Sequence, residues 1–316
     1  MAKYFHQTIL ALLAVTLLFF FTACADTLPP PLAITAPPGS DYAFAAVLAT
    51  QLPEESGWVF NLSLAADSVQ ALSLVDQQER TLAIVESDLL SDAYQGIDLW
   101  ADRPTLRHTA VLATLYPLPC VLVVAADNPA AFISAKAGTR LSLGQDSTAI
   151  TARRLLAASG LDTSQLTLSE EDLKTACIKL KAGELDGFFC LSPRPNPQIL
   201  ALAADYPIKL LSLSAAAQKQ LDQTYPYYNT ITLTANDYPF LTEELSAAAL
   251  SATLICNTNL TTDVAYELVR DLYTARRPIA AAHLQGRYLD TNGSLDGLVD
   301  LLHPGAAIYY QEQGRI

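Results

Sequence analysis

The sequence predicts an α/β protein made of two lobes in series, each built around a mostly parallel sheet. Short apolar runs alternate with amphipathic stretches along the chain, which is the pattern of βαβ units. The length of 316 residues is enough for two ordinary domains. Hydrophobic residues make up 51% and charged residues 16%, which supports a large buried core and excludes a disordered chain.

The first 25 residues are expected to form a signal peptide. Residues 8–21 carry no charge and are too few for a membrane-spanning helix, which needs about 20 apolar residues. Cleavage after Ala25 is one interpretation. The other is a lipobox that ends at Cys24, which would then carry a lipid anchor, and its place directly after the apolar run favours this. Residues 28–31 follow as a proline-rich tether, so we expect export to the periplasm or the outer face of the membrane.

Apolar runs and cap residues place the elements of the two predicted lobes. In the first lobe we expect strands at 32–35, 82–85, 111–115 and 121–124, with helices at 40–51 (stopped by Pro53), 67–74 and 87–96. In the second we expect strands at 140–143, 187–191 and 208–213, with helices at 148–159, at 170–182 and from the proline-rich loop 193–197 to 205.

Charge and cysteine content exclude several function classes. The net charge of −13 disfavours nucleic acid and anionic headgroups as partners. Histidines and cysteines are too few and too scattered for a zinc module, and we expect neither a metal nor a cofactor. Four cysteines lie beyond the tether, and they could form two disulfides or remain as buried thiols. They are Cys120, Cys177, Cys190 and Cys256. No nucleophile elbow, phosphate loop or HExxH helix is present, so we expect no enzyme.

The order of several short segments resembles the TAXI-type substrate-binding proteins that serve TRAP transporters. No single segment is specific for this family, but seven of them in this order behind a signal peptide are hard to obtain by chance. The segments that carry the resemblance are 82–88 (LAIVESD), 115–117 (LYP), 153–156 (RRLL), 183–189 (GELDGFF), 195–197 (PNP), 225–228 (YPYY) and 303–305 (HPG) with Tyr309 and Tyr310.

The resemblance implies a two-lobe periplasmic-binding-protein fold of type II whose chain crosses between lobes twice, near Ala125 and Thr230. Lobe one would be 26–125 plus 231–316, and lobe two 126–230. It implies a monomer that captures a small carboxylate or amino acid, such as glutamate or 2-oxoglutarate, and delivers it to a TRAP membrane permease. A sensor serving a signalling partner and an ABC-type binding protein are the alternatives.

Two loops are the expected ligand contacts, because ligands of α/β sheets collect where strands end and helices begin. The first is 36–41 and the second is 144–147. The hydroxyl donors at these helix starts are Ser40, Ser147 and Thr148, with Gln145 beside them, and plain helix capping is the alternative for each hydroxyl.

Three carboxylates depart from the family pattern. Asp41, Glu86 and Asp146 stand where the family has neutral residues or glycine-rich loops. If all three face the cleft, a dicarboxylate becomes a poor ligand and a solute with a cationic group a better one. If Asp41 and Asp146 cap their helices toward solvent, this does not follow.

Further cleft contacts are expected from aromatic and polar side chains: Tyr42, Tyr116, Tyr228, Asn196 and Ser87. Core packing is the alternative for the tyrosines, and capping of its own loop is the alternative for Asn196. Asp88 is expected to cap a helix, and Arg153 and Arg154 to pair with acidic surface residues.

Overall fold

The structure is a computed structural model, which describes residues 31–289, 295 and 297–316. The expected signal peptide, Cys24 and most of the tether lie outside the described residues. Within the described part of the chain, every helix is too short or too polar to cross a bilayer.

Ten strands of the described chain form one mixed sheet, in which β8 and β9 pair beside the main path β2-β1-β3-β10-β4-β7-β5-β6. β1 pairs in parallel with β2 and β3, and β5 pairs in parallel with β6 and β7. The strands are β1 (Leu32–Ala36), β2 (Phe60–Leu64), β3 (Thr81–Glu86), β4 (Thr109–Ala125), β5 (Arg140–Ser142), β6 (Thr167–Ser169), β7 (Gly187–Leu191), β8 (Ile208–Leu211), β9 (Asn229–Leu233) and β10 (Leu245–Asn257).

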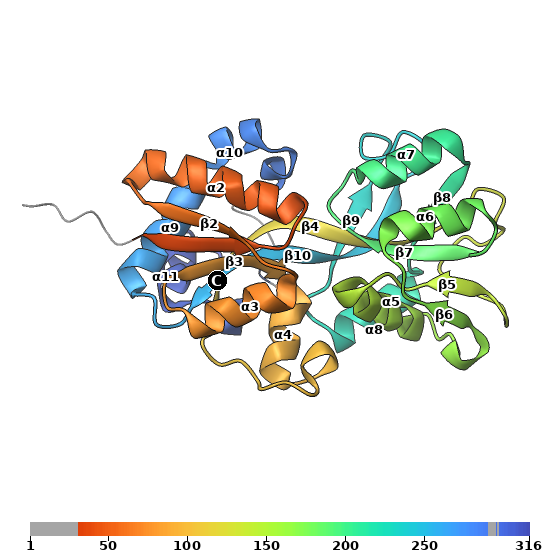
Figure 1. Ribbon diagram of the computed structural model, residues 1–316, viewed down its shortest axis with the longest axis horizontal. Helices are drawn as coiled ribbons and strands as arrows, with labels where there is room; N and C mark the ends of the chain where they lie inside the picture. Colours follow the sequence, from red (N-terminus) through yellow and green to blue (C-terminus); the bar gives the residue numbers. More distant parts are fainter. Residues whose placement is uncertain (1–30, 290–294, 296) are drawn as a thin grey trace, which may run out of the picture. The chain divides into compact units, whose positions relative to one another are not determined.

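Two long antiparallel strands, β4 and β10, join the two halves of the sheet (Figure 1). The early part of β10 pairs with β9, and its late part pairs with β3. The late part of β4 pairs with β7 and β8. We call the half around β1 to β3 the first lobe and the half around β5 to β7 the second lobe.

Helices cover both faces of the sheet in the first lobe. α2 packs with α9 and α11 in one hydrophobic cluster, and buries Phe44, Leu48 and Leu52 at four-residue spacing. α3 and α4 pack in a separate cluster on the other face (Figure 1). The helices are α2 (Ser40–Ser56), α3 (Ser68–Gln77), α4 (Ser87–Gln95), α9 (Thr262–Thr274), α10 (Arg276–Ala282) and α11 (Pro304–Glu312), with 3-10 turns at Asp98–Trp100, Leu284–Tyr288 and Val299–Leu301.

The second lobe has the same layered design. α5 and α8 share the large cluster that also contains α2, whereas α6 and α7 form a third cluster with β7, β8 and the early part of β10. The helices are α5 (Asp146–Ala158), α6 (Leu173–Lys181), α7 (Pro197–Asp205) and α8 (Ala215–Thr224), with a 3-10 turn at Thr163–Gln165.

The elements expected between residues 32 and 213 are present with four main differences, and no element was predicted beyond residue 213. The two strands expected at 111–115 and 121–124 are one strand, β4, which continues through Pro117 and Pro119. The short strands β2 and β6 were not expected. α2 continues past Pro53 to Ser56, and α6 starts at Leu173 rather than 170, because Asp172 caps it by accepting a hydrogen bond from the backbone N–H of Thr175.

The four described cysteines are free thiols, so the buried-thiol interpretation is confirmed against the disulfide one. Cys120, Cys190 and Cys256 are buried and Cys177 is partly buried. Burial raises the pKa of Cys190 to about 11, which keeps this thiol protonated and unreactive at neutral pH.

Candidate functional site

A cavity of about 300 Å³ lies where four strands end and four helices begin. It follows β1, β2 and β3 in the first lobe and β5 in the second, as expected for a ligand site of an α/β sheet. Both lobes line it, with Pro37, Pro38, Asp41, Ala66, Asp67, Ser68, Val69, Glu86 and Leu99 from the first and Gln145, Asp146, Ser147 and Thr148 from the second.

Asp41 lies in the first turn of α2 and faces this cavity. The phenol of Tyr116, on β4, donates a hydrogen bond of 2.5 Å to Oδ1 of Asp41. Burial raises the pKa of Asp41, and the hydrogen bond from Tyr116 acts in the opposite direction. Tyr116 therefore supports the cavity from behind Asp41 rather than lining it.

Glu86 ends β3 and precedes α4, and its side chain lines the cavity. Its Oε2 is buried and accepts no hydrogen bond from the residues that the structure describes. Burial, followed by the nearby charge of Asp41, raises the pKa of Glu86 to about 7, and a hydrogen bond from Ser68 acts against this. The charge of Asp146 also contributes to the rise. With this pKa, Glu86 is partly protonated and partly ionised near neutral pH.

The loop before α5 brings the second lobe to the cavity. Gly144 has φ of +78°, and a Cβ there would lie 2.5 Å from Cγ2 of Thr148, so only glycine fits this turn. Asp146 has φ of +49°, a region that Asp and Asn tolerate best among residues with a Cβ. No side chain described in the structure caps the first turn of α5, although Ser147 is buried there. The N-terminal end of α5 therefore borders the cavity without a capping side chain.

The cavity brings together five of the residues expected at the ligand: Asp41, Glu86, Gln145, Ser147 and Thr148. The three carboxylates that depart from the family pattern, Asp41, Glu86 and Asp146, line the same space. The sequence did not point to Leu99 as a cavity residue, and it placed Asp67 only at the start of the helix expected over 67–74. Asp67 does cap α3, by accepting a hydrogen bond from the N–H of Gln70, and it lines the cavity as well.

The other residues expected to contact the ligand either lie outside the cavity lining or make structural hydrogen bonds and core contacts. Ser40 begins α2 but does not line the cavity, and Tyr42 packs on the core next to it. The hydroxyl of Ser87 accepts a hydrogen bond of 3.2 Å from the N–H of Ser251. Asn196 caps α7 by accepting from the N–H groups of Gln198 and Ile199, so its capping alternative is confirmed.

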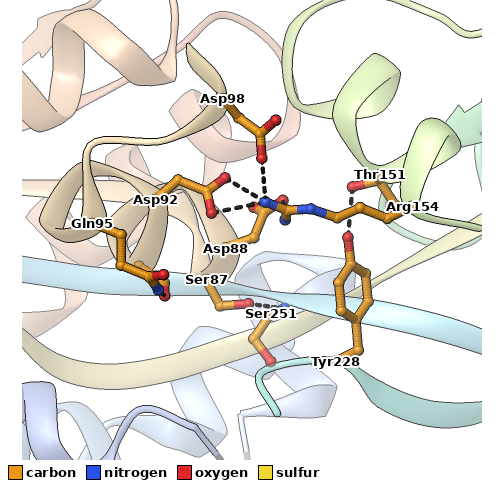
Figure 2. Close-up of polar contacts among 10 residues, drawn as sticks. Ser87, Asp88, Asp92, Gln95, Asp98, Thr151, Arg154, Tyr228 and Ser251 are labelled. Carbon is orange, nitrogen blue, oxygen red and sulfur yellow. Dashed lines mark hydrogen bonds and ion pairs between the residues drawn. The ribbon is translucent and has the colours of Figure 1, made fainter. Parts of the chain in front are cut away.

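Arg154, in the interior of α5, makes a buried ion-pair cluster that crosses from the second lobe to the first (Figure 2). Its guanidinium lies 3.2 Å from Asp88, 2.8 Å from Asp92 and 2.7 Å from Asp98. The expectation that Arg154 pairs with acidic residues is right, but it is wrong that they lie at the surface, since Arg154, Asp88 and Asp92 are all buried. Asp88 binds Arg154 instead of simply capping α4.

Tyrosine rings enclose the other side of the guanidinium. The ring of Tyr225 lies 4.6 Å from it and that of Tyr227 5.7 Å, both within cation-π range. The phenol of Tyr228 donates a 3.2 Å hydrogen bond to Oγ1 of Thr151, one turn before Arg154 (Figure 2). Tyr228, expected on the cleft wall, thus holds α5 within the second lobe.

The fold is the two-lobe periplasmic-binding-protein fold that the sequence predicted, and the cavity lies where its two lobes meet. The model of the NMT1-like family matches residues 34–314. The chain therefore belongs to the NMT1-like family. This family is of the solute-binding and not the enzymatic type, which confirms the expectation that the chain is not an enzyme.

Solved structures with the same fold share little sequence with this chain. One, described as the structure of a periplasmic transporter, is 13% identical with a TM-score of 0.52, over 90% of this chain and 93% of the other. A probable amino-acid ABC transporter extracellular-binding protein from Bacillus subtilis is 10% identical, with a TM-score of 0.52 over 82% and 97%. The zinc-bound ligand-binding component of an ABC-type import system from Staphylococcus aureus is 10% identical, with a TM-score of 0.52 over 91% and 100%.

Proposed function

We propose that this protein is the extracytoplasmic receptor of a membrane importer and that it captures one small solute in the cavity between its lobes. The observation that carries the proposal is the cavity itself, which lies at the carboxyl ends of β1, β2, β3 and β5 and is lined by both lobes. A solute held there gains contacts from the second lobe only when the lobes are together. Binding and lobe closure are therefore linked.

The hinge of this receptor is proposed to lie in β4 and β10. The sequence expected crossings near Ala125 and Thr230, and these limits stay a prediction. Cys120 to Ala125 of β4 pair only with second-lobe strands, and Leu233, Tyr238 and Ala247 pack in the cluster of α6 and α7. These contacts favour crossings earlier in β4, near Pro117 and Pro119, and later in the chain, near Ser251 of β10.

Two features of this segment suit a hinge. The prolines have no N–H to donate, so this stretch of β4 forms fewer ladder bonds than its two ends. The pairing of β4 with β10 also shifts register between Ala252 and Thr253, next to the proposed crossing. Weak pairing and a bulge permit bending without loss of the sheet on either side.

A TRAP-type permease is the proposed partner, because the ordered segments of the mature chain resemble TAXI proteins. An ABC importer is the second candidate, favoured by structures of the same fold whose names place them in ABC systems. Uptake in vesicles separates the two. A sodium gradient drives a TRAP system, whereas an ABC system needs ATP hydrolysis. Anchoring through Cys24 is proposed on the lipobox resemblance, and acyl-chain labelling of the cell-expressed protein tests it.

The receptor function is tested by a ligand screen with two measurements on the same mature protein. Thermal unfolding detects binding, because a ligand at 100 times its Kd stabilises the folded state by about 2.7 kcal/mol. Small-angle X-ray scattering detects closure as a fall in the radius of gyration. A receptor gives both with the same solute. Solutes that stabilise the protein without any fall in the radius of gyration contradict the proposal.

A further inference from the structure

We infer that the solute of this cavity carries an ammonium group that pairs with Glu86, and that its net charge is zero or positive. This deepens the proposed function and rests on it. It departs from the dicarboxylate ligand that the family resemblance implies.

The first argument is the charge that lines the cavity. Four carboxylates face it, and among the described residues that line it none is Lys, Arg or His. The residues are Asp41, Asp67, Glu86 and Asp146. Arg154, the arginine that bridges the lobes, is already held by three aspartates. A dicarboxylate would have to enter this space without a single cationic side chain to receive it, which like-charge repulsion opposes.

The second argument is that the four carboxylates differ in what holds them. Asp67 accepts a backbone hydrogen bond in the cap of α3, and Asp41 accepts one from the phenol of Tyr116. Asp146 lies in the first turn of α5, where the helix dipole favours a negative charge. Glu86 differs because its Oε2 is buried and has no hydrogen-bond partner among the described residues.

A buried carboxylate oxygen without a partner is costly, and a bound cation removes that cost. An ammonium group supplies three donors on one compact charge, so it can bond Oε2 of Glu86 and still reach Asp41. Asp41 and Asp146 line the same cavity as Glu86, so a cation bound there faces all three carboxylates. Glu86 is therefore a specificity-determining residue of the cavity.

The opposite wall leaves room for a second polar group on the same solute. Ser147 and Thr148 line the cavity at the start of α5, whose first turn has no capping side chain. A helix start of this kind receives a carboxylate well. An amino acid and a simple amine thus share the ammonium, and they differ in whether the α5 end is used.

The experiment is titration calorimetry on the mature protein with a fixed panel of solutes. The panel contains the twenty amino acids, ethanolamine, putrescine, cadaverine, succinate and 2-oxoglutarate. The variants are Glu86→Gln, which removes the charge and keeps the shape, and, as the matched control, Glu243→Gln at an exposed carboxylate that does not line the cavity. Asp146→Asn is a second variant, because Asn also tolerates its positive φ.

We expect at least one amine or amino acid of non-negative net charge to bind, and Glu86→Gln to weaken it by about tenfold or more. Glu243→Gln should leave the affinity unchanged. A preference for an amino acid over the matching amine assigns the α5 end to the carboxylate.

Three outcomes overturn the inference. If a dicarboxylate binds best, the inference is wrong but the receptor function stands. The same holds if an amine binds Glu86→Gln as tightly as it binds the wild type. A panel in which no amine binds also overturns it, and if no solute of any charge binds or closes the lobes, the receptor function fails with it.

Discussion

Arg154 of α5 and Asp92 of α4 join the two lobes through one guanidinium nitrogen, which lies 2.8 Å from both carboxylate oxygens of Asp92. Both side chains are buried, and Asp88 and Asp98 reach the same guanidinium. Because α5 also carries the second-lobe wall of the cavity, this cluster (Figure 2) holds that wall against the first lobe. Burial raises the pKa of Asp92 to about 6, while the charge of Arg154 acts against this rise.

Replacing Arg154 with Met should separate the lobes and destabilise the protein. The change leaves the buried Asp88 and Asp92 without a counter-charge, and breaking a buried ion pair from one side costs roughly 3 kcal/mol. We expect a lower unfolding temperature and, with ligand bound, a larger radius of gyration than the wild type has.

Arg153→Met is the matched control, since the neighbouring Arg153 pairs with Glu170 and both of these side chains are about half exposed. It should change neither measurement appreciably. Equal radii of gyration for Arg154→Met and the wild type would show that the cluster does not hold the lobes together.

Lowering the pH from 8 to 5 should stabilise the ligand-free protein through Glu86. The pKa of Glu86 is about 7 in the folded protein and 4.5 in the unfolded chain, so the folded state binds the proton more tightly. This stabilisation is complete below about 4.5 and is lost as the pH rises through 7. A difference of this size amounts to about 3 kcal/mol as an upper limit.

Urea unfolding of the wild type and Glu86→Gln at several pH values measures this contribution. Glutamine is neutral throughout, so the variant should be more stable than the wild type at pH 8 and about equal to it at pH 5. Parallel pH profiles of the two proteins would mean that Glu86 ionises normally.

The affinity for an amine should rise with pH, whereas the stability that Glu86 gives the ligand-free protein falls with pH. The ammonium needs ionised Glu86, so binding should strengthen as the pH rises from 5.5 and level off about one unit above the pKa of about 7. Calorimetry across this range checks it, with Glu86→Gln as the reference for all other titrating groups. An affinity that falls over this range in the wild type alone would contradict the assigned pairing.

Local signals in the sequence were enough to find two of the loops that line the cavity. Pro37, Pro38 and Gly39 end a buried strand before a helix, and Gly144 to Ser147 do the same in the second lobe. Both positions follow from turn and cap preferences, which act over a few residues. The sequence also marked Asp41, Glu86 and Asp146 as unusual, but only the fold shows that they share one cavity.

The interlobe cluster could not be predicted in the same way. Arg154 lies 66 residues from Asp88 and 62 from Asp92, and an arginine inside an amphipathic helix has the local pattern of a surface residue. Pro117 and Pro119 misled the strand assignment for a related reason. A proline has no N–H group, so it disfavours a central strand unless the neighbouring strands need no hydrogen-bond donor at its position. In β4 that condition depends on where the strand passes from one half of the sheet to the other, which the sequence does not reveal.

Ser147→Ala should weaken the best ligand at least several-fold while leaving stability nearly unchanged. Ser147 is buried at the cavity, and its hydroxyl does not cap α5, so its removal costs ligand contacts and not a helix cap. Calorimetry and urea unfolding measure the two effects separately.

Ser214→Ala is the matched control, because the hydroxyl of Ser214 caps α8 by accepting from the N–H of Ala217, away from the cavity lining. That variant should lose about 1 kcal/mol of stability and no affinity. If Ser147→Ala behaves like Ser214→Ala, with stability lost and affinity kept, then Ser147 is a structural residue and the second-lobe contact must come from Gln145 or Thr148.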